Sequence, residues 1–165
     1  MNIQKLVVGE LRENCYIVTR NGKTLIIDPG DEFEIILEHT KNLDVVEVLV
    51  THHHFDHIGA LSQVEDYFHI KENEKSGYFD YEIIKTPGHT SDAQTFYFKE
   101  NKVMFTGDFI FLNTIGRTDL KTSSDSDMIN SLNLISKYPD DITIYPGHGN
   151  KTTLGHEKNN FRFYY

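Results

Sequence analysis

The sequence has little that would place the protein outside the cell, in a membrane or on nucleic acid. Its one cysteine, Cys15, cannot form an internal disulfide, so a reducing cytoplasm is the expected compartment. No apolar run approaches the ~18 residues of a membrane-spanning helix, and residues 1–6 lack the character of a secretory signal. Basic residues are few, 16 against 25 acidic ones, and the net charge of -9 disfavours nucleic acid and anionic membranes as partners.

The chain of 165 residues has the length of a single domain, and one domain spanning 1–165 is expected. Its 11 Phe and 9 Tyr can fill a substantial core. Apolar patterning predicts strands at 15–19, 23–27, 45–50, 81–86, 95–98, 103–106 and 142–145, and helices at 33–40, 57–68 and around 128–135. This order predicts a layered α/β fold with mixed sheets.

Three of the 4 prolines precede a glycine, at Pro29, Pro87 and Pro146. Proline fixes φ and glycine permits positive φ, so each pair predicts a turn. Each pair also follows a β-rich run directly. The sequence therefore predicts strands that end sharply and present polar residues at their carboxyl ends, with Asp28 before the first turn.

The most informative segment is Thr51-His52-His53-His54-Phe55-Asp56-His57, which follows the apolar run ending at Val50. In extended backbone, residues two apart project to one side, so His52 and His54 share a side and His53 points away as a non-ligand. Imidazole and carboxylate groups suit zinc, iron and manganese. Further groups of these types follow other predicted strands, giving a candidate ligand set of His52, His54, Asp56, His57, His89, Asp108 and His148.

This set resembles the metallo-β-lactamase superfamily. Six strings resemble its glyoxalase II-like (hydroxyacylglutathione hydrolase-like) branch: Asn14-Cys15-Tyr16, Ile27-Asp28-Pro29-Gly30, Thr86-Pro87-Gly88-His89-Thr90, Thr106-Gly107-Asp108, Ile115-Gly116-Arg117-Thr118-Asp119 and Pro146-Gly147-His148-Gly149. The resemblance runs from about Asn14 to Phe161. It implies a four-layer αβ/βα sandwich, with two mixed β-sheets flanked by helices and a metal site at one edge.

The resemblance also implies roles for these residues. One divalent metal ion would take His52, His54 and His89, a second would take Asp56, His57 and His148, and Asp108 would bridge the two. Zinc is the expected metal, with iron or manganese as alternatives. Asp56 and Asp108 would be catalytic by holding a metal-bridging hydroxide that cleaves a small thioester or ester-like substrate. Two metals in such a pair lower the pKa of a shared water towards ~7.

Other residues would support this centre. Asp28 is expected to accept a hydrogen bond from a ligand histidine, and Thr51 to assist it. Arg117 is the candidate for binding an anionic group of the substrate, because guanidinium grips carboxylates at two points. An alternative role for Arg117 is structural, with its loop anchored through Asp119.

Several features leave the substrate open. The chain stops soon after His148, whereas full glyoxalase II enzymes carry a C-terminal helical domain that helps to bind glutathione. The stretch from His57 to His89 is also short for this branch. The substrate is expected to be a small molecule, either a glutathione thioester or the ester of another thiol.

Two alternative functions remain. One is a persulfide dioxygenase-like enzyme with a single iron on His52, His89 and Asp108, and the other is a non-catalytic metalloprotein with a trimmed pocket. The aromatic tail 161–165 leaves a homodimer open.

Overall fold

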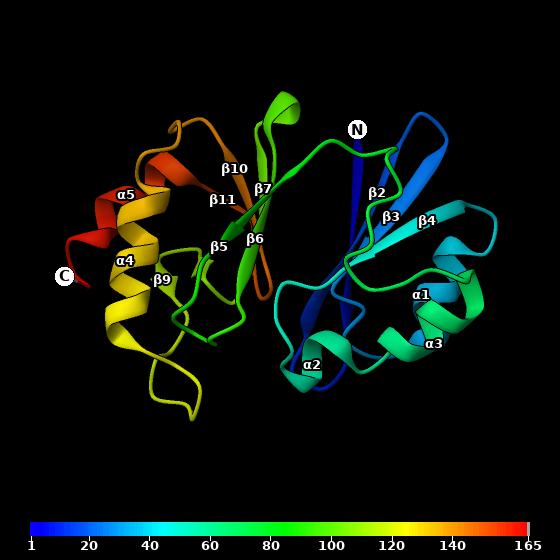
Figure 1. The fold of residues 1–165 in the computed structure, drawn as a ribbon, viewed down its shortest axis with the longest axis horizontal. Coiled ribbons are helices and arrows are strands. Elements are labelled where there is room, and N and C mark those ends of the chain that lie inside the picture. Colours follow the sequence, from blue (N-terminus) through cyan, green and yellow to red (C-terminus); the bar gives the residue numbers. More distant parts are fainter. Residues whose placement is uncertain (165) are drawn as a thin grey trace. The chain divides into compact units, whose positions relative to one another are not determined.

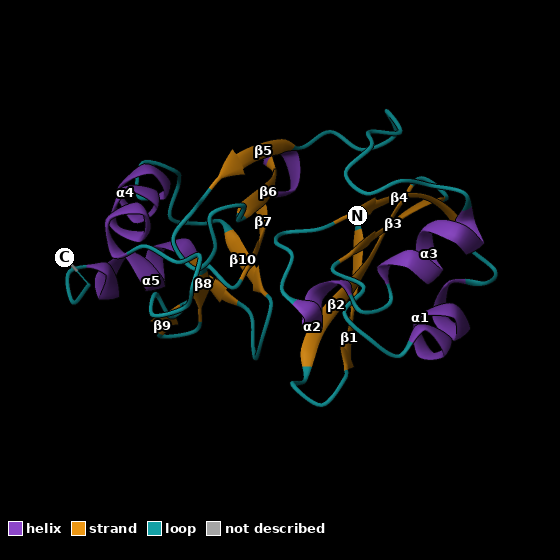
Figure 2. Ribbon diagram, turned by 60° about the horizontal axis from the view of Figure 1, so that its bottom comes forward, coloured by secondary structure: helices purple, strands orange, loops and turns teal. Residues whose placement is uncertain are grey.

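The computed structural model describes residues 1–164, and the chain divides into two compact units, residues 1–80 and residues 81 onward (Figure 1). Each unit carries one of the main sheets with helices packed on it (Figure 2). Both sheets mix parallel and antiparallel pairs. The predicted fold class, α/β with two mixed sheets flanked by helices, is confirmed.

The first unit is built on a 4-stranded sheet in the order β1-β2-β3-β4. Its strands pair antiparallel except for β3 and β4, which run parallel. The turn between β2 and β3 places Asn21 and Gly22 at φ 52° and 77°, the positive values that a two-residue hairpin turn requires. The elements are β1 (Asn2–Val8), β2 (Glu13–Arg20), β3 (Lys23–Ile27), α1 (Phe33–Thr40), β4 (Asp44–Leu49), α2 (Phe55–Ile58) and α3 (Leu61–Phe68).

The core of the first unit forms where α1 and α3 cover one face of this sheet. Ile36 of α1 and Val64 of α3 are fully buried against apolar side chains of the strands. In β1 and β2 these strand residues are two apart, as expected when only one face of a sheet contacts a given helical layer, and in β4 a register shift separates them by three. They are Leu6, Val8, Cys15, Ile17, Ile26, Val45 and Val48.

The second unit is built on a 5-stranded sheet in the order β11-β10-β7-β6-β5. A small hairpin of β8 and β9 leaves the end of β7, and a 3-10 turn at Lys99–Asn101 joins β6 to β7. The elements are β5 (Glu82–Lys85), β6 (Gln94–Phe98), β7 (Val103–Gly107), β8 (Ile110–Phe111), β9 (Thr114–Ile115), α4 (Asp125–Ile135), β10 (Thr143–Pro146), β11 (Thr152–Thr153) and α5 (Leu154–Phe161).

Helices α4 and α5 form the core of the second unit with this sheet. Leu132 of α4 and Leu154 of α5 are fully buried in one cluster with Met104 and Ile144 of the strands. The Ser124 hydroxyl caps α4 by accepting a hydrogen bond from the N–H of Asp127 at 3.2 Å.

The predicted strands are confirmed to within about two residues at each end, but the helix predicted at 57–68 is wrong as a single element. Helix α2 ends at Ile58 and α3 begins at Leu61. The N–H of Ala60 donates to the carbonyl oxygen of Pro29 at 3.0 Å, which diverts it from the helical hydrogen-bond series. The expectation of one domain over 1–165 stays a prediction.

Two further expectations concern the surface of the protein. Among residues 1–164, the structure contains no helix with the length and apolar character needed to cross a bilayer. Of the aromatic tail, Phe161 is buried, Phe163 is exposed and Tyr164 packs partly on the core of the second unit, while Tyr165 lies outside the described residues. Dimerisation stays a prediction.

Cys15 is fully buried in β2, and this burial raises the pKa of its thiol well above the usual value, with Glu13 and Asp28 adding to the effect. Thiolate is the reactive form, so we expect Cys15 to resist a disulfide reagent such as DTNB at pH 8 in the folded protein. It should react stoichiometrically once the chain is unfolded in guanidinium chloride. Rapid labelling of the folded protein would contradict this environment.

Candidate metal centre

In the first unit, the predicted polar residues gather where the parallel strands β3 and β4 end. Ile27 and Leu49 are partners in register, and the N–H of Asp28 donates to the carbonyl oxygen of Leu49 at 2.9 Å. The segments that follow β3 and β4 therefore begin side by side. This pairing brings Asp28 to the segment that begins at Thr51.

Asp28 is buried and holds this segment through three hydrogen bonds. Its carboxylate accepts from the N–H of Thr51 at 2.7 Å, from the Thr51 hydroxyl at 2.7 Å and from Nδ1–H of His57 at 3.0 Å. The backbone of Asp28 adopts φ 50°, a conformation uncommon for residues other than glycine. Asp28 and Thr51 thus contact the residues that the sequence predicted they would support.

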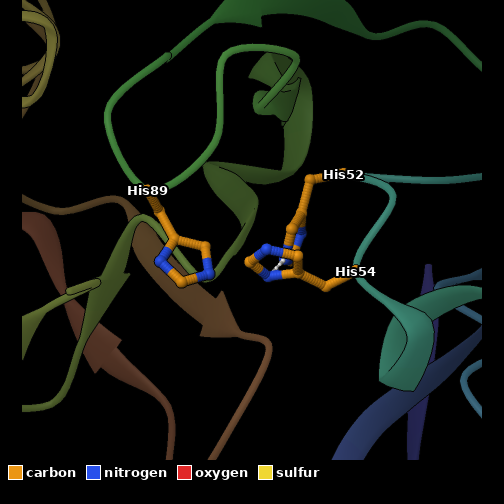
Figure 3. A group of neighbouring side chains, drawn as sticks. All are labelled: His52, His54 and His89. Carbon is orange, nitrogen blue, oxygen red and sulfur yellow. Dashed lines mark hydrogen bonds between the residues drawn. The ribbon is translucent and has the colours of Figure 1, made fainter. Parts of the chain in front are cut away.

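The four candidate ligands of the first unit lie together around the start of α2. Nε2 of His52 is 3.2 Å from Nδ1 of His54, and the rings of His52 and His57 are 4.2 Å apart between centroids. Nε2 of His57 is 3.9 Å from a carboxylate oxygen of Asp56. Figure 3 shows His52 and His54 on the loop before α2, with the contact between them dashed, and His89 on the loop after β5. His53 points elsewhere, with Nε2 3.0 Å from Glu72.

The candidate ligands of the second unit also follow strand ends. Strands β5, β7 and β10 run in one direction, because β7 is parallel to β10 and β6 is antiparallel to both β5 and β7. Their carboxyl ends therefore meet at one edge of the sheet, where His89, Asp108 and His148 follow. The two carboxylate oxygens of Asp108 lie 3.5 Å from Nε2 of His89 and 3.6 Å from Nε2 of His148.

Three of these histidines have their Nδ1 atoms held by neighbouring groups. Nδ1–H of His52 donates to the Thr51 hydroxyl at 3.1 Å, that of His57 donates to Asp28, and that of His89 donates to the carbonyl oxygen of Arg117 at 2.9 Å. Each ring therefore has its Nε2 atom available to bind a metal ion. Metal-bound histidines typically show this arrangement, because the second hydrogen bond selects the tautomer and orients the ring. The donor set of nitrogen and carboxylate oxygen atoms fits a divalent transition metal.

Arg117, the predicted anion-binding residue, forms a two-point ion pair with Asp119. Its Nε and Nη2 atoms donate to the Asp119 carboxylate at 2.6 and 2.7 Å. These hydrogen bonds lower the pKa of Asp119 to about 2 and raise the pKa of the guanidinium. The structural alternative for Arg117, a loop anchored through Asp119, is thus present, and its backbone carbonyl also orients His89.

Sequence reasoning missed Glu13, which lies buried beside this centre in the first unit. Oε1 of Glu13 is 3.8 Å from Nδ1 of His57, and Glu13, Asp28 and His57 form one buried cluster. The only available signal was its place directly before the Asn14-Cys15-Tyr16 string.

Two glycines let backbone pass very close to candidate ligands, one in each unit. A Cβ atom at Gly30 would lie 1.9 Å from the carbonyl oxygen of Asp56, and one at Gly116 would lie 1.9 Å from the carbonyl oxygen of Asp108. Both distances are far inside van der Waals contact. The sequence indicated Gly30 as a turn residue and Gly116 as part of a string that resembles the family, but the close approach depends on the tertiary fold.

Comparison with known proteins identifies a family. Residues 8–72 and 74–148 match the family described as the metallo-beta-lactamase superfamily. The hydroxyacylglutathione hydrolase GloC of Haemophilus influenzae is 32% identical over 96% of this chain and 95% of its own length. That alignment spans 202 positions against 165 residues here, so at least 37 positions of the alignment have no residue of this chain.

Two solved structures match nearly the whole chain. The BLEG-1 B3 metallo-beta-lactamase superposes with a TM-score of 0.91 at 28% identity, covering 99% of both chains. TTHA1623 in a di-iron-bound form superposes with a TM-score of 0.87 at 27% identity, covering 97% of this chain and 99% of the other. These likenesses agree with the order of strands and helices described above.

Proposed function

Because the chain belongs to the metallo-beta-lactamase superfamily, we propose that it is a metal-dependent hydrolase of small thioesters or ester-like substrates. One observation carries the proposal: both units present Nε2 atoms and carboxylates at the carboxyl ends of their strands, with Nδ1 of His52, His57 and His89 already held. The likeness to a hydroxyacylglutathione hydrolase supports the choice of thioesters.

We assign the ligands as the sequence predicted them. His52, His54 and His89 hold one divalent metal, Asp56, His57 and His148 hold the other, and Asp108 is shared. The two contacts of Asp108 within the second unit, one from each carboxylate oxygen, suit a shared ligand. When bound, such a pair supplies water activated near neutral pH and polarises the substrate carbonyl. Zinc is the proposed metal, and the di-iron form of TTHA1623 makes iron the first alternative.

The protein's own contribution is to position these ligands. Asp28 holds the proton of His57 on Nδ1 and, through the Thr51 hydroxyl, orients His52. The carbonyl oxygen of Arg117 holds the proton of His89 on Nδ1. With the tautomers set in advance, the ligands need little reorganisation to bind metal.

The function is tested by assaying metal-saturated protein on S-lactoylglutathione, other thioesters and lactones. We expect turnover of at least one thioester, its loss after chelation, and its return when zinc, iron or manganese is restored. A saturated protein that hydrolyses none of them contradicts the proposal and leaves a non-catalytic metalloprotein. Oxygen consumption with glutathione persulfide, at about one iron per chain, would instead support the dioxygenase alternative.

Replacing Asp28 by asparagine tests the supporting role directly. The carboxylate accepts from the Thr51 N–H at one oxygen and from the Thr51 hydroxyl and His57 at the other, whereas the asparagine amide has a single oxygen and turns an N–H₂ group towards the remaining donors. We expect zinc affinity, measured by competition with a chromophoric chelator, to fall roughly 10- to 100-fold. Asp44→Asn, which removes an exposed carboxylate on β4, is the matched control. Unchanged affinity in Asp28→Asn would contradict this role.

A further inference from the structure

The first unit contains a pocket of about 370 Å³ that reaches the candidate ligand Asp56. Its lining includes the apolar residues Val8, Leu11 and Phe55 and the acidic residues Glu10 and Asp31. Its size lies within the usual range for small-molecule sites. Gly9, Gly30 and Gly59 complete the lining.

One hydrogen bond between two loops and one within a loop hold this pocket in shape. The N–H of Gly9, in the turn between β1 and β2, donates to a carboxylate oxygen of Glu32 at 2.9 Å. The carboxylate of Asp31 accepts from the N–H of Glu32 at 2.7 Å. The turn that carries Glu10 and Leu11 is thereby fastened to the loop that follows β3.

The apolar part of the lining includes an exposed aromatic residue. Phe55, which directly precedes Asp56, is 73% exposed. Leu11, which also lines the pocket, is 53% exposed. Large exposed apolar side chains that share a pocket are typical of binding surfaces. An aromatic face beside carboxylates also favours alkylammonium groups over carboxylate groups.

The second unit has a pocket of about 410 Å³ at the candidate ligand His148, lined by Phe111, Leu112, Thr114, Gly149 and Asn150. Among the described residues 1–164, neither this pocket nor the one at Asp56 is lined by lysine or arginine. Lys151 lies over the ring of Tyr145 at 5.9 Å and lines a neighbouring pocket instead. Arg117 is paired with Asp119.

From these linings we infer that the enzyme selects thioesters and esters whose leaving group is neutral or positively charged, bound against Phe55 and Leu11 with any cation near Glu10 and Asp31. Carboxylate-bearing leaving groups, glutathione included, are disfavoured by these acidic residues. This inference rests on the proposed function and narrows its substrate class.

Three butyryl thioesters with the same acyl group and thiol portions of different charge test this selectivity. They are butyrylthiocholine, S-butyryl-N-acetylcysteamine and S-butyryl-3-mercaptopropionate, which are cationic, neutral and anionic. We expect kcat/KM to fall in that order, with at least a tenfold difference between the first and the last. Equal values, or a preference for the anionic ester, would overturn the inference while leaving the hydrolase function intact.

Neutralising Glu10 and Asp31 should abolish the order of kcat/KM among the three thioesters. The double variant Glu10→Gln, Asp31→Asn is expected to bring the cationic-to-anionic ratio within about threefold of unity. The control Glu38→Gln, Asp66→Asn removes the same charge from exposed positions that do not line the pocket, and should keep the parent ratio. A ratio unmoved by the first variant would overturn the assignment of these carboxylates.

The aromatic wall is tested by Phe55→Ala, which should lower kcat/KM for butyrylthiocholine about tenfold. Phe163→Ala is its matched control, because that ring is 70% exposed in the second unit. Equal losses in both variants would contradict the role of Phe55.

A binding measurement separates failure of this inference from failure of the proposed function. Saturation-transfer NMR with butyltrimethylammonium and with hexanoate needs no turnover. Binding of the cation alone would uphold the charge selectivity even in a protein that hydrolyses nothing. Equal binding of the two ions, or none of either, would overturn it.

Discussion

Replacing Asp108 by alanine should lower kcat/KM for thioester hydrolysis by about 10³-fold or more. The carboxylate contacts both other candidate ligands of the second unit, His89 and His148, one through each oxygen. A ligand shared by two metals positions both, and metal ions contribute several kcal/mol to stabilising a hydrolytic transition state. A loss of about 4 kcal/mol corresponds to a factor of roughly 10³.

The measurement is kcat/KM together with metal content per chain. Asp141→Asn is a suitable control, because Asp141 is an exposed carboxylate in the same unit that pairs with Lys102. We expect the Asp108 variant to lose metal as well as activity, and the control to keep its metal. An Asp108 variant within tenfold of the parent, at full metal content, would show that the carboxylate is not a shared ligand.

The second large effect is expected from Gly116→Ala. The new Cβ would lie 1.9 Å from the carbonyl oxygen of Asp108 and 3.0 Å from Cβ of His89. Backbone cannot yield as a flexible side chain does, so the loop must move and take both residues with it. Overpacking of this kind typically costs about 3 kcal/mol. We expect Tm to fall by roughly 6–12 °C, with loss of metal affinity.

Gly77→Ala is the control for a glycine replacement, because a Cβ at Gly77 meets no atom within 4 Å. Its φ of +82° still disfavours alanine, which should cost about 1 kcal/mol. Gly116 is not among the glycines with positive φ, so the extent to which Gly116→Ala melts below Gly77→Ala is a minimum measure of the close approach at Asp108. Equal melting temperatures would show that the backbone contact is not required.

The strands could be predicted because apolar runs, turn residues and strand ends coincide in this sequence. The hairpin at Asn21 and Gly22 is an example, since both residues adopt the positive φ that their types favour. Strand β1 was missed because only Leu6 and Val8 of its side chains are buried, so its apolar pattern is weak. Its pairing along β2 stabilises it, and such pairing is not visible in local sequence.

The candidate ligands could be predicted from their types and their places after strands, and each unit brings its own members together. What the sequence could not show is how these residues are supported. The contact of Glu13 with His57 and the carbonyl oxygen of Arg117 at His89 arise from tertiary packing. The same holds for the division of the helix after Ile58, where the backbone of Ala60 binds Pro29.

We propose that the two sets of ligands hold a pair of metals with Asp108 shared between them. A crystal structure of the zinc-saturated protein, with anomalous data at the zinc edge, would locate each ion. We expect two zinc ions per chain, one on His52, His54 and His89, the other on Asp56, His57 and His148, and both on Asp108. A single ion, or Asp108 or His148 beyond coordinating distance of the zinc ions, would contradict it.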